Sequence, residues 1–212
     1  MINDRIASLS PMDQQTYALL LKMQNETQPI EPSLESLLTI HKELFAGFLP
    51  TAGQIRTHNL WKGIYFCMEK NLSDQLNQWF GRFAKFYKTM TIRNIPELAA
   101  YYCHLNWIHP FDEGNGRVQR EFFRRLLAKK GCVFNLSQTT HKDMIEASFL
   151  AIRDKNPLKM ADIFEKTIRP NDDCMEYYAN LPYLAILSQN DISLGIANYS
   201  KRKAKIIQRE GT

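Results

Sequence analysis

The stretch HPFDEGNGRVQR, residues 109–120, combines one histidine, two acids, two glycines around an asparagine, and two arginines. Proline disfavours helical geometry in the residue before it, so a helix that precedes this stretch should end by His109. A second helix should begin after the glycines, because the residues RVQREFFRRLL place apolar side chains at helical spacing. The stretch is therefore predicted to be a loop between two buried helices.

The start of the second helix has the features of a phosphate-binding site. A helix N-terminus offers free backbone N–H groups and the positive end of the helix dipole. Gly114 and Gly116 would let the backbone approach a ligand. Arg117 and Arg120 lie three residues apart, so they should project from roughly the same helix face and suit a polyphosphate. Each feature alone has a structural explanation, but their convergence favours a site.

The other polar residues of the stretch fit phosphate chemistry. Asp112 or Glu113 could hold Mg²⁺, the usual companion of nucleotide phosphates. His109 could accept a proton from an attacking hydroxyl near neutral pH. Phe111 should point into the core and pin the loop. The residues thus predict a site that binds phosphates and activates a hydroxyl group.

Helical periodicity dominates the rest of the chain. Helices are expected within residues 13–23, 29–49, 72–90, 95–108, 117–130, 141–154, 157–168 and 174–187. Residues 52–68 are different, because Thr, Ile, Trp, Tyr and Phe with two glycines favour short extended segments or a hairpin. The expected fold class is mainly α, a helical bundle with a short β-hairpin flap.

Composition excludes several classes of protein. The net charge is +5, with much of the excess in YSKRKAKIIQRE near the C-terminus, so a nucleic-acid-binding domain is not favoured. That basic tail is either a solvated terminal helix, a contact for an anionic partner or an export signal. No apolar run is long enough to span a membrane, and the polar start is not a signal peptide. The four cysteines form no C-x-x-C pair, which indicates a reducing, cytoplasmic compartment.

The opening stretch resembles the signature of Fic-domain proteins: His, x, Phe, x, acid, Gly, Asn, Gly, Arg, x, x, Arg. Every specified position is filled. LFAGFLPTAGQIR and IYFCMEKNLSDQL are similar to the family's segments around its flap, although Thr51 stands where Trp is usual. The resemblance covers roughly residues 34–168, which leaves 1–33 as an N-terminal helical extension and 169–212 as a C-terminal helical appendage with the basic tail.

The resemblance implies a protein adenylyltransferase, which transfers AMP from ATP to a Ser, Thr or Tyr hydroxyl of a target protein and releases pyrophosphate. His109 would be the general base, and Glu113 would hold Mg²⁺ against the α- and β-phosphates. Asn115, with the N–H groups around Gly114 and Gly116, would cradle the α-phosphate.

The resemblance also assigns the remaining site residues. Arg117 would bind the β-phosphate and Arg120 the γ-phosphate. The flap, about residues 58–70, would hold the target segment by strand addition. The flap residues expected to do so are Lys62, Gly63, Ile64, Tyr65 and Phe66.

Other activities stay open. Related Doc toxins, which phosphorylate their target, have Ala-Asn-Lys in place of Gly-Asn-Gly, so Gly116 favours AMP transfer. Phosphocholine transfer is a second alternative. A non-catalytic nucleotide-binding interaction module is the alternative from another class, and it is disfavoured because no catalytic position is lost.

Many Fic proteins carry an inhibitory helix whose Glu pairs with the second signature arginine, here Arg120. Its pattern is Ser or Thr, three residues, Glu, then Gly or Asn. Glu210–Gly211 has Ile206 in place of the hydroxyl residue, and residues 27–31 are followed by Pro32. Two explanations remain: a separate small antitoxin supplies the Glu, or the protein is an unrestrained effector that is translocated into a host cell.

Overall fold

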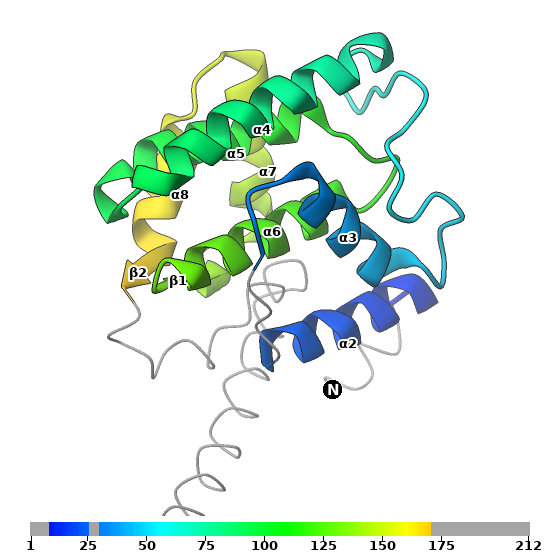
Figure 1. The fold of residues 1–212 in the computed structure, drawn as a ribbon, viewed down its shortest axis with the longest axis horizontal. Helices are drawn as coiled ribbons and strands as arrows, with labels where there is room; N and C mark the ends of the chain where they lie inside the picture. The colour runs from blue at the N-terminus through cyan, green and yellow to red at the C-terminus, as the bar shows by residue number, and fades with distance from the viewer. Residues whose placement is uncertain (1–8, 26–29, 171–212) are drawn as a thin grey trace, which may run out of the picture.

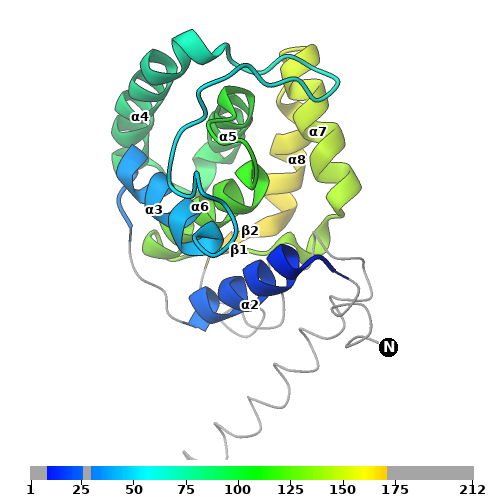
Figure 2. The ribbon, with the colours of Figure 1, turned by 90° about the vertical axis from the view of Figure 1, so that its right-hand side faces the viewer.

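Helix α5, Ile95–Ile108, forms the centre of the fold. The computed structural model describes residues 9–25 and 30–170. Four helices pack around α5, as Figure 2 shows. They are α4 (Leu72–Thr89), α6 (Asn115–Lys129), α7 (His141–Arg153) and α8 (Leu158–Thr167). The sequence of α5, IPELAAYYCHLNWI, is apolar on most of its circumference, as a helix with neighbours on several sides requires.

Two further helices lie on the outer side of α6. Helix α3, Leu34–Phe45, packs against α6, and α2, Pro11–Asn25, lies against α3 (Figure 1). Helix α3 lies within the range 29–49 that the sequence predicted, and it begins at Leu34 because the Ser33 hydroxyl accepts a hydrogen bond from the Ser36 backbone N–H at 3.2 Å. The expected helix in residues 13–23 is confirmed, with two extra residues at each end.

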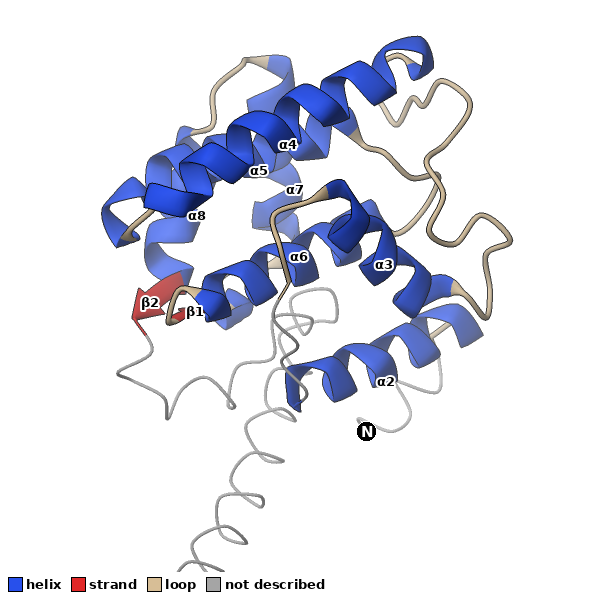
Figure 3. Ribbon diagram, in the orientation of Figure 1, coloured by secondary structure: helices blue, strands red, loops and turns tan. Residues whose placement is uncertain are grey.

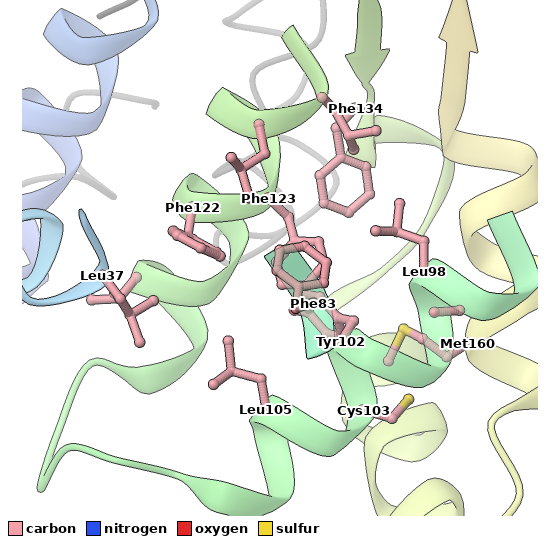
Figure 4. Close-up of a cluster of buried hydrophobic side chains, with 14 of the residues drawn as sticks. Leu37, Phe83, Leu98, Tyr102, Cys103, Leu105, Phe122, Phe123, Phe134 and Met160 are labelled. Atoms are coloured by element: carbon pink, nitrogen blue, oxygen red, sulfur yellow. The ribbon is translucent and has the colours of Figure 1, made fainter. Parts of the chain in front are cut away.

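An aromatic core joins α4, α5 and α6 (Figure 4). Phe83 of α4 and Tyr102 of α5 lie against Phe123 of α6, with ring centroids 5.6 and 5.1 Å away. Burying each phenyl ring contributes about 1.5–3 kcal/mol. This packing fixes the position of the end of α5 relative to the start of α6, and so it positions the loop between them.

Helix α6 also buries charge. Glu121 is fully buried and accepts hydrogen bonds from Arg124 and from Arg125, at 2.7 Å each. Arg125 in turn donates to Glu43 of α3 at 3.0 Å. Buried charges are tolerated only when they are paired, so this network joins α3 to α6 behind the signature loop.

The β structure differs from the expectation. The sheet consists of β1 (Cys132–Phe134) and β2 (Ile168–Pro170), which are antiparallel and pair Phe134 with Ile168 (Figure 3). Strands of three residues are too short for periodicity to reveal them. In the expected hairpin near residues 52–68, the structure has only an isolated bridge between Trp61 and Tyr65.

The prediction of a mainly α fold is confirmed. Gly131 follows α6 with a φ of 69°, the left-handed conformation in which a glycine commonly ends a helix. The helix expected within 174–187, the basic tail, Glu210 and part of residues 27–31 lie outside the described residues, and the division at residues 33 and 168 stays a prediction. Among the described helices, none is long and apolar enough to cross a membrane.

Candidate active site

His109 lies directly after the last residue of α5, in a left-handed conformation with a φ of 51°. This confirms that Pro110 ends the helix. The His109 Nδ1 atom is 3.0 Å from the Asn106 carbonyl oxygen. Because a carbonyl only accepts, Nδ1 carries the hydrogen, and Nε2 keeps a lone pair that can accept a proton.

Burial keeps the His109 imidazole neutral. The ring stacks on Phe66 with centroids 3.8 Å apart. The pKa of His109 is lowered to about 4. Burial is the main cause, and the positive charges of Lys62 and Arg56 act in the same direction, whereas the hydrogen bond to Asn106 opposes them. A base must be unprotonated before it reacts, so the site holds His109 in the form that general base catalysis needs.

Arg56 holds the end of α5 and the flap together, and the sequence analysis missed it. The buried guanidinium donates to the backbone carbonyls of His109 at 2.8 Å and Ile108 at 3.3 Å, and also to those of Cys67 and His58. A lone arginine in a loop has no periodic signal. The only hint was that Arg56 ends the segment LFAGFLPTAGQIR, which resembles the family.

The Asn115 side chain closes the signature loop. Its Oδ1 accepts from the Phe111 backbone N–H at 2.9 Å, and its Nδ2 donates to the Phe111 carbonyl at 2.6 Å. Both ends of the amide are therefore used within the loop. Phe111 is buried, as expected. The Asn115 side chain is therefore not available to a phosphate, and a contact would come from its backbone N–H. Among the described residues, no side chain caps the N-terminus of α6, so the N–H groups of its first turn are open to a ligand.

A second histidine, His41, packs against the signature loop. The buried His41 ring stacks on Phe111 with centroids 3.9 Å apart. Its Nδ1 accepts from the Gly53 N–H at 2.7 Å, so Nε2 donates to the Glu113 carbonyl at 3.2 Å. Local sequence does not reveal this role of His41, because its partners Gly53 and Glu113 lie in two other segments of the chain.

The two glycines of the signature have different packing reasons. Gly114 has a φ of 79°, and a Cβ there would lie 2.3 Å from the Phe45 ring. A Cβ at Gly116 would lie 3.0 Å from the Arg120 Nη1 atom. Gly114 is therefore required by the fold itself, and Gly116 leaves room for the Arg120 side chain to lie across the start of α6.

Glu113 is the carboxylate that faces the cavity. Its Oε1 accepts from the Gly114 N–H at 2.8 Å and from Arg117 at 3.3 Å, and its Oε2 is 3.8 Å from the Lys62 Nζ. Partial burial acts to raise the pKa of Glu113, but the Gly114 hydrogen bond and the two cations outweigh it and lower that pKa. The alternative acid, Asp112, lies 3.6 Å from His58 and does not line the cavity.

The two signature arginines do not aim at the same place. Arg120 is buried and lines the cavity. Arg117 does not line it: its guanidinium donates to Asp13 of α2 at 2.7 Å and lies 4.8 Å from the centre of the Phe45 ring. The expectation of a shared direction is wrong for this structure, because an acid from α2 holds one arginine. The assignment of Arg117 to the β-phosphate stays a prediction.

A cavity of about 490 Å³ lies between the signature loop, the flap and α7. Alternate flap residues Lys62, Ile64 and Phe66 line it, whereas Gly63 and Tyr65 do not, and Tyr65 is 80% exposed. Alternation of this kind is typical of extended backbone. In Figure 2 the loop that contains the flap crosses over α5 and reaches α7.

Helix α7 forms the wall opposite the flap, and the sequence analysis assigned it no role. Its lining residues are His141, Met144, Ile145, Ser148, Phe149 and Ile152. Their spacing is that of one helix face, which the sequence shows. Whether such a face meets the core or a cavity depends on its neighbours, which the sequence pattern does not show.

Fold and site together define a helical protein of the Fic type. Residues 31–127 match the model of the Fic/DOC family. The probable protein adenylyltransferase Fic of Escherichia coli K12 is 30% identical over 110 residues, which cover 50% of this chain and 55% of that protein. The protein adenylyltransferase VbhT of Bartonella schoenbuchensis is 28% identical over 120 residues, or 54% of this chain and 25% of that one.

Solved structures show the same fold. The N-terminal Fic domain of a VirB-translocated effector from Bartonella quintana, with bound ADP, has a TM-score of 0.68 at 26% identity and covers 80% of this chain and 85% of that one. BepC from Bartonella tribocorum, with bound AMPPNP, has a TM-score of 0.68 at 21% identity and covers 79% and 88%. The chain spans about half the length of the first curated relatives it matches.

Proposed function

We propose that this protein transfers AMP from ATP to a Ser, Thr or Tyr hydroxyl of a target protein. The observation that carries the proposal is the state of His109: a neutral imidazole that donates through Nδ1 to Asn106 and lines a cavity together with Glu113 and Arg120. The names of the relatives and the nucleotides bound to the structural neighbours support it.

The cavity suits a nucleoside triphosphate. Its volume of about 490 Å³ lies in the range of small-molecule sites. The α-phosphate would lie at the start of α6, where no described side chain caps the first-turn N–H groups. The γ-phosphate would lie toward Arg120. The apolar side chains Ile145, Phe149 and Ile152 of α7 would pack against the base.

Glu113 fits the carboxylate of a magnesium site. Glu113 lines the cavity, and its Oε2 atom lies 3.8 Å from the Lys62 Nζ atom. Magnesium in nucleotide sites is held by one or two carboxylates, phosphates and water. Among the described residues, no three His, Cys, Asp or Glu side chains form a protein cage for a metal. When bound, the ion would neutralise phosphate charge.

The residues of the chain then move one proton and bind the leaving group. As the target hydroxyl oxygen attacks the α-phosphorus, its proton passes to the His109 Nε2 atom. The bond from the α-phosphorus to the oxygen that bridges to the β-phosphate breaks, and pyrophosphate leaves on the Arg120 side. Catalysis consists mainly of positioning and electrostatic stabilisation.

The flap would hold the target. Lys62, Ile64 and Phe66 face the cavity, while Trp61 and Tyr65 are 63% and 80% exposed. A target segment could add alongside this extended backbone and pack on the two exposed rings. Neighbours described as VirB-translocated effectors support a target in another cell. For such a protein the two explanations of restraint given above both stay open: a separate small protein whose Glu pairs with Arg120, or an unrestrained effector.

The test uses ATP labelled at either the α- or the γ-phosphate, with Mg²⁺ and lysates of bacterial and eukaryotic cells. Label should reach a protein only from the α position, and mass spectrometry should find an added AMP. His109→Ala should abolish labelling. His104→Ala is the matched control, because His104 lies on α5, which ends directly before His109, but does not line the cavity. Label from the γ position alone, or labelling by the His109 variant, would refute the proposal.

A further inference from the structure

The cavity contains a basic side chain that lies outside the signature stretch. His141 is the first residue of α7, and it lines the same cavity as Gly116 and Arg120. We propose that His141 binds the terminal phosphate of the nucleotide together with Arg120. This inference rests on the nucleotide site proposed above.

The charge of the substrate requires a second cation near Arg120. A nucleoside triphosphate carries about four negative charges, and sites for polyphosphates combine several cationic groups. Among the basic residues that line the cavity, Lys62 comes from the flap and faces Glu113, and His109 is the neutral base. Arg117 is bound to Asp13. His141 is the lining residue left to assist Arg120.

The local structure leaves the His141 imidazole available for a ligand. The N-terminus of α7 is capped by Thr140, whose hydroxyl accepts from the Asp143 backbone N–H at 3.1 Å. The Asp143 carboxylate accepts in return from the Thr140 hydroxyl at 2.7 Å. The helix end is thus satisfied without His141. The site consists of the two side chains that line the cavity, and the helix terminus is not part of it.

Electrostatics make His141 responsive to an anion. Burial lowers its pKa, and the positive charge of Arg120 lowers it further. On its own helix the charged neighbours are Lys142 and Asp143, and Asp143 is engaged with Thr140. A phosphate beside the ring would oppose the effect of Arg120 and raise the pKa of His141. Triphosphate binding should therefore draw a proton from solvent onto the imidazole.

The experiment measures binding by calorimetry with the full chain carrying His109→Ala, which prevents turnover. In this background His141→Gln should weaken ATP binding roughly five-fold and leave AMP binding unchanged, because AMP has no terminal phosphate. Lys142→Gln is the matched control: it removes a neighbouring cation that does not line the cavity, and it should change ATP binding less than two-fold. The hydrogen bonds that cap α7 do not involve the His141 side chain, so the melting temperature should stay at the parent value.

A second readout separates a direct contact from a general effect. Titrations near pH 7 in two buffers with different ionisation enthalpies give the number of protons taken up with ATP. The His109→Ala protein should take up a fraction of a proton when it binds ATP, and the same protein with His141→Gln should take up less. Three outcomes with His141→Gln would overturn the role of His141 and leave the proposed function intact. They are an equal loss of ATP and AMP binding, unchanged ATP binding, and unchanged proton uptake. If the parent binds no ATP, the proposed function fails, and the inference fails with it.

Discussion

The Asp13 carboxylate of α2 lies 2.7 Å from the Arg117 guanidinium, and so a helix outside the signature controls where one signature arginine points. The Arg117 side chain is 12% exposed and also donates to Glu113. Asp13 thus competes with any phosphate for Arg117. This contact makes α2 part of the site even though no residue of α2 lines the cavity.

Removing the charge of Asp13 should therefore strengthen nucleotide binding. In Asp13→Asn, we expect Arg117 to reach the β-phosphate and ATP to bind about three-fold more tightly, because the half-exposed Asp13 carboxylate no longer competes with the phosphate. Asp74→Asn, in the first turn of α4, is the control. Calorimetry gives both affinities. Weaker binding in Asp13→Asn would mean that Asp13 holds Arg117 in its productive position and does not compete with the phosphate, and unchanged binding would contradict the assignment of Arg117 to the β-phosphate.

The buried His109 should make the fold less stable in acid. Its pKa is lowered to about 4 by burial, whereas in the unfolded chain it returns to about 6.5. As the pH falls below 6.5, the unfolded state binds the proton first, so stability present above pH 6.5 is lost progressively down to pH 4. The loss amounts to ~3 kcal/mol over that window.

Urea unfolding at several pH values compares the parent with His109→Gln, which cannot titrate there. The free energy of unfolding should fall more steeply between pH 6.5 and 4 in the parent. Parallel curves for the two proteins would show that His109 is not held neutral by the fold. Other histidines with lowered pKa values titrate in both proteins and cancel in the difference.

Arg56 should control the order of the flap. Arg56→Met leaves buried carbonyls of the flap and of the α5 end without their donor, and we expect a loss of about 3 kcal/mol in unfolding free energy. Limited proteolysis should cut the flap, residues 58–70, faster. Arg56→Lys keeps the charge but loses the fork of donors, so it should be intermediate. Arg82→Met, on an exposed position of α4, is the control. An uncut flap in Arg56→Met would contradict this role.

Alanine substitutions at Gly114 and Gly63 separate the cost of close packing from the cost of backbone strain. Both have positive φ, 79° and 76°, but a Cβ at Gly63 meets nothing within 4 Å. Gly63→Ala should cost only ~1–2 kcal/mol for the left-handed backbone. Gly114→Ala adds the collision with Phe45 and should cost roughly 1–3 kcal/mol more. Chemical denaturation measures both. Equal losses would mean that Phe45 moves aside without cost.

Local signals in the sequence were sufficient for the framework of the site. Pro110 predicts the end of α5, and the structure ends α5 at Ile108. The glycines predict the turn into α6, which begins at Asn115. The alternation of flap residues around Gly63 is local as well. These features depend on the backbone preferences of neighbouring residues, and such preferences act whatever the rest of the chain does.

The sequence by itself determined the mainly α fold, the match of residues 31–127 to the Fic/DOC family model and the loop with His109, Glu113 and Arg120. Only the tertiary structure showed that Arg117 turns to an acid 104 residues earlier in the chain. Only the tertiary structure showed that Arg56 and His41 donate hydrogen bonds to backbone carbonyls of the signature stretch, and that α7 lines the cavity. Each of these depends on contacts between residues far apart in sequence, so neither the spacing of a motif nor a helical period contains it.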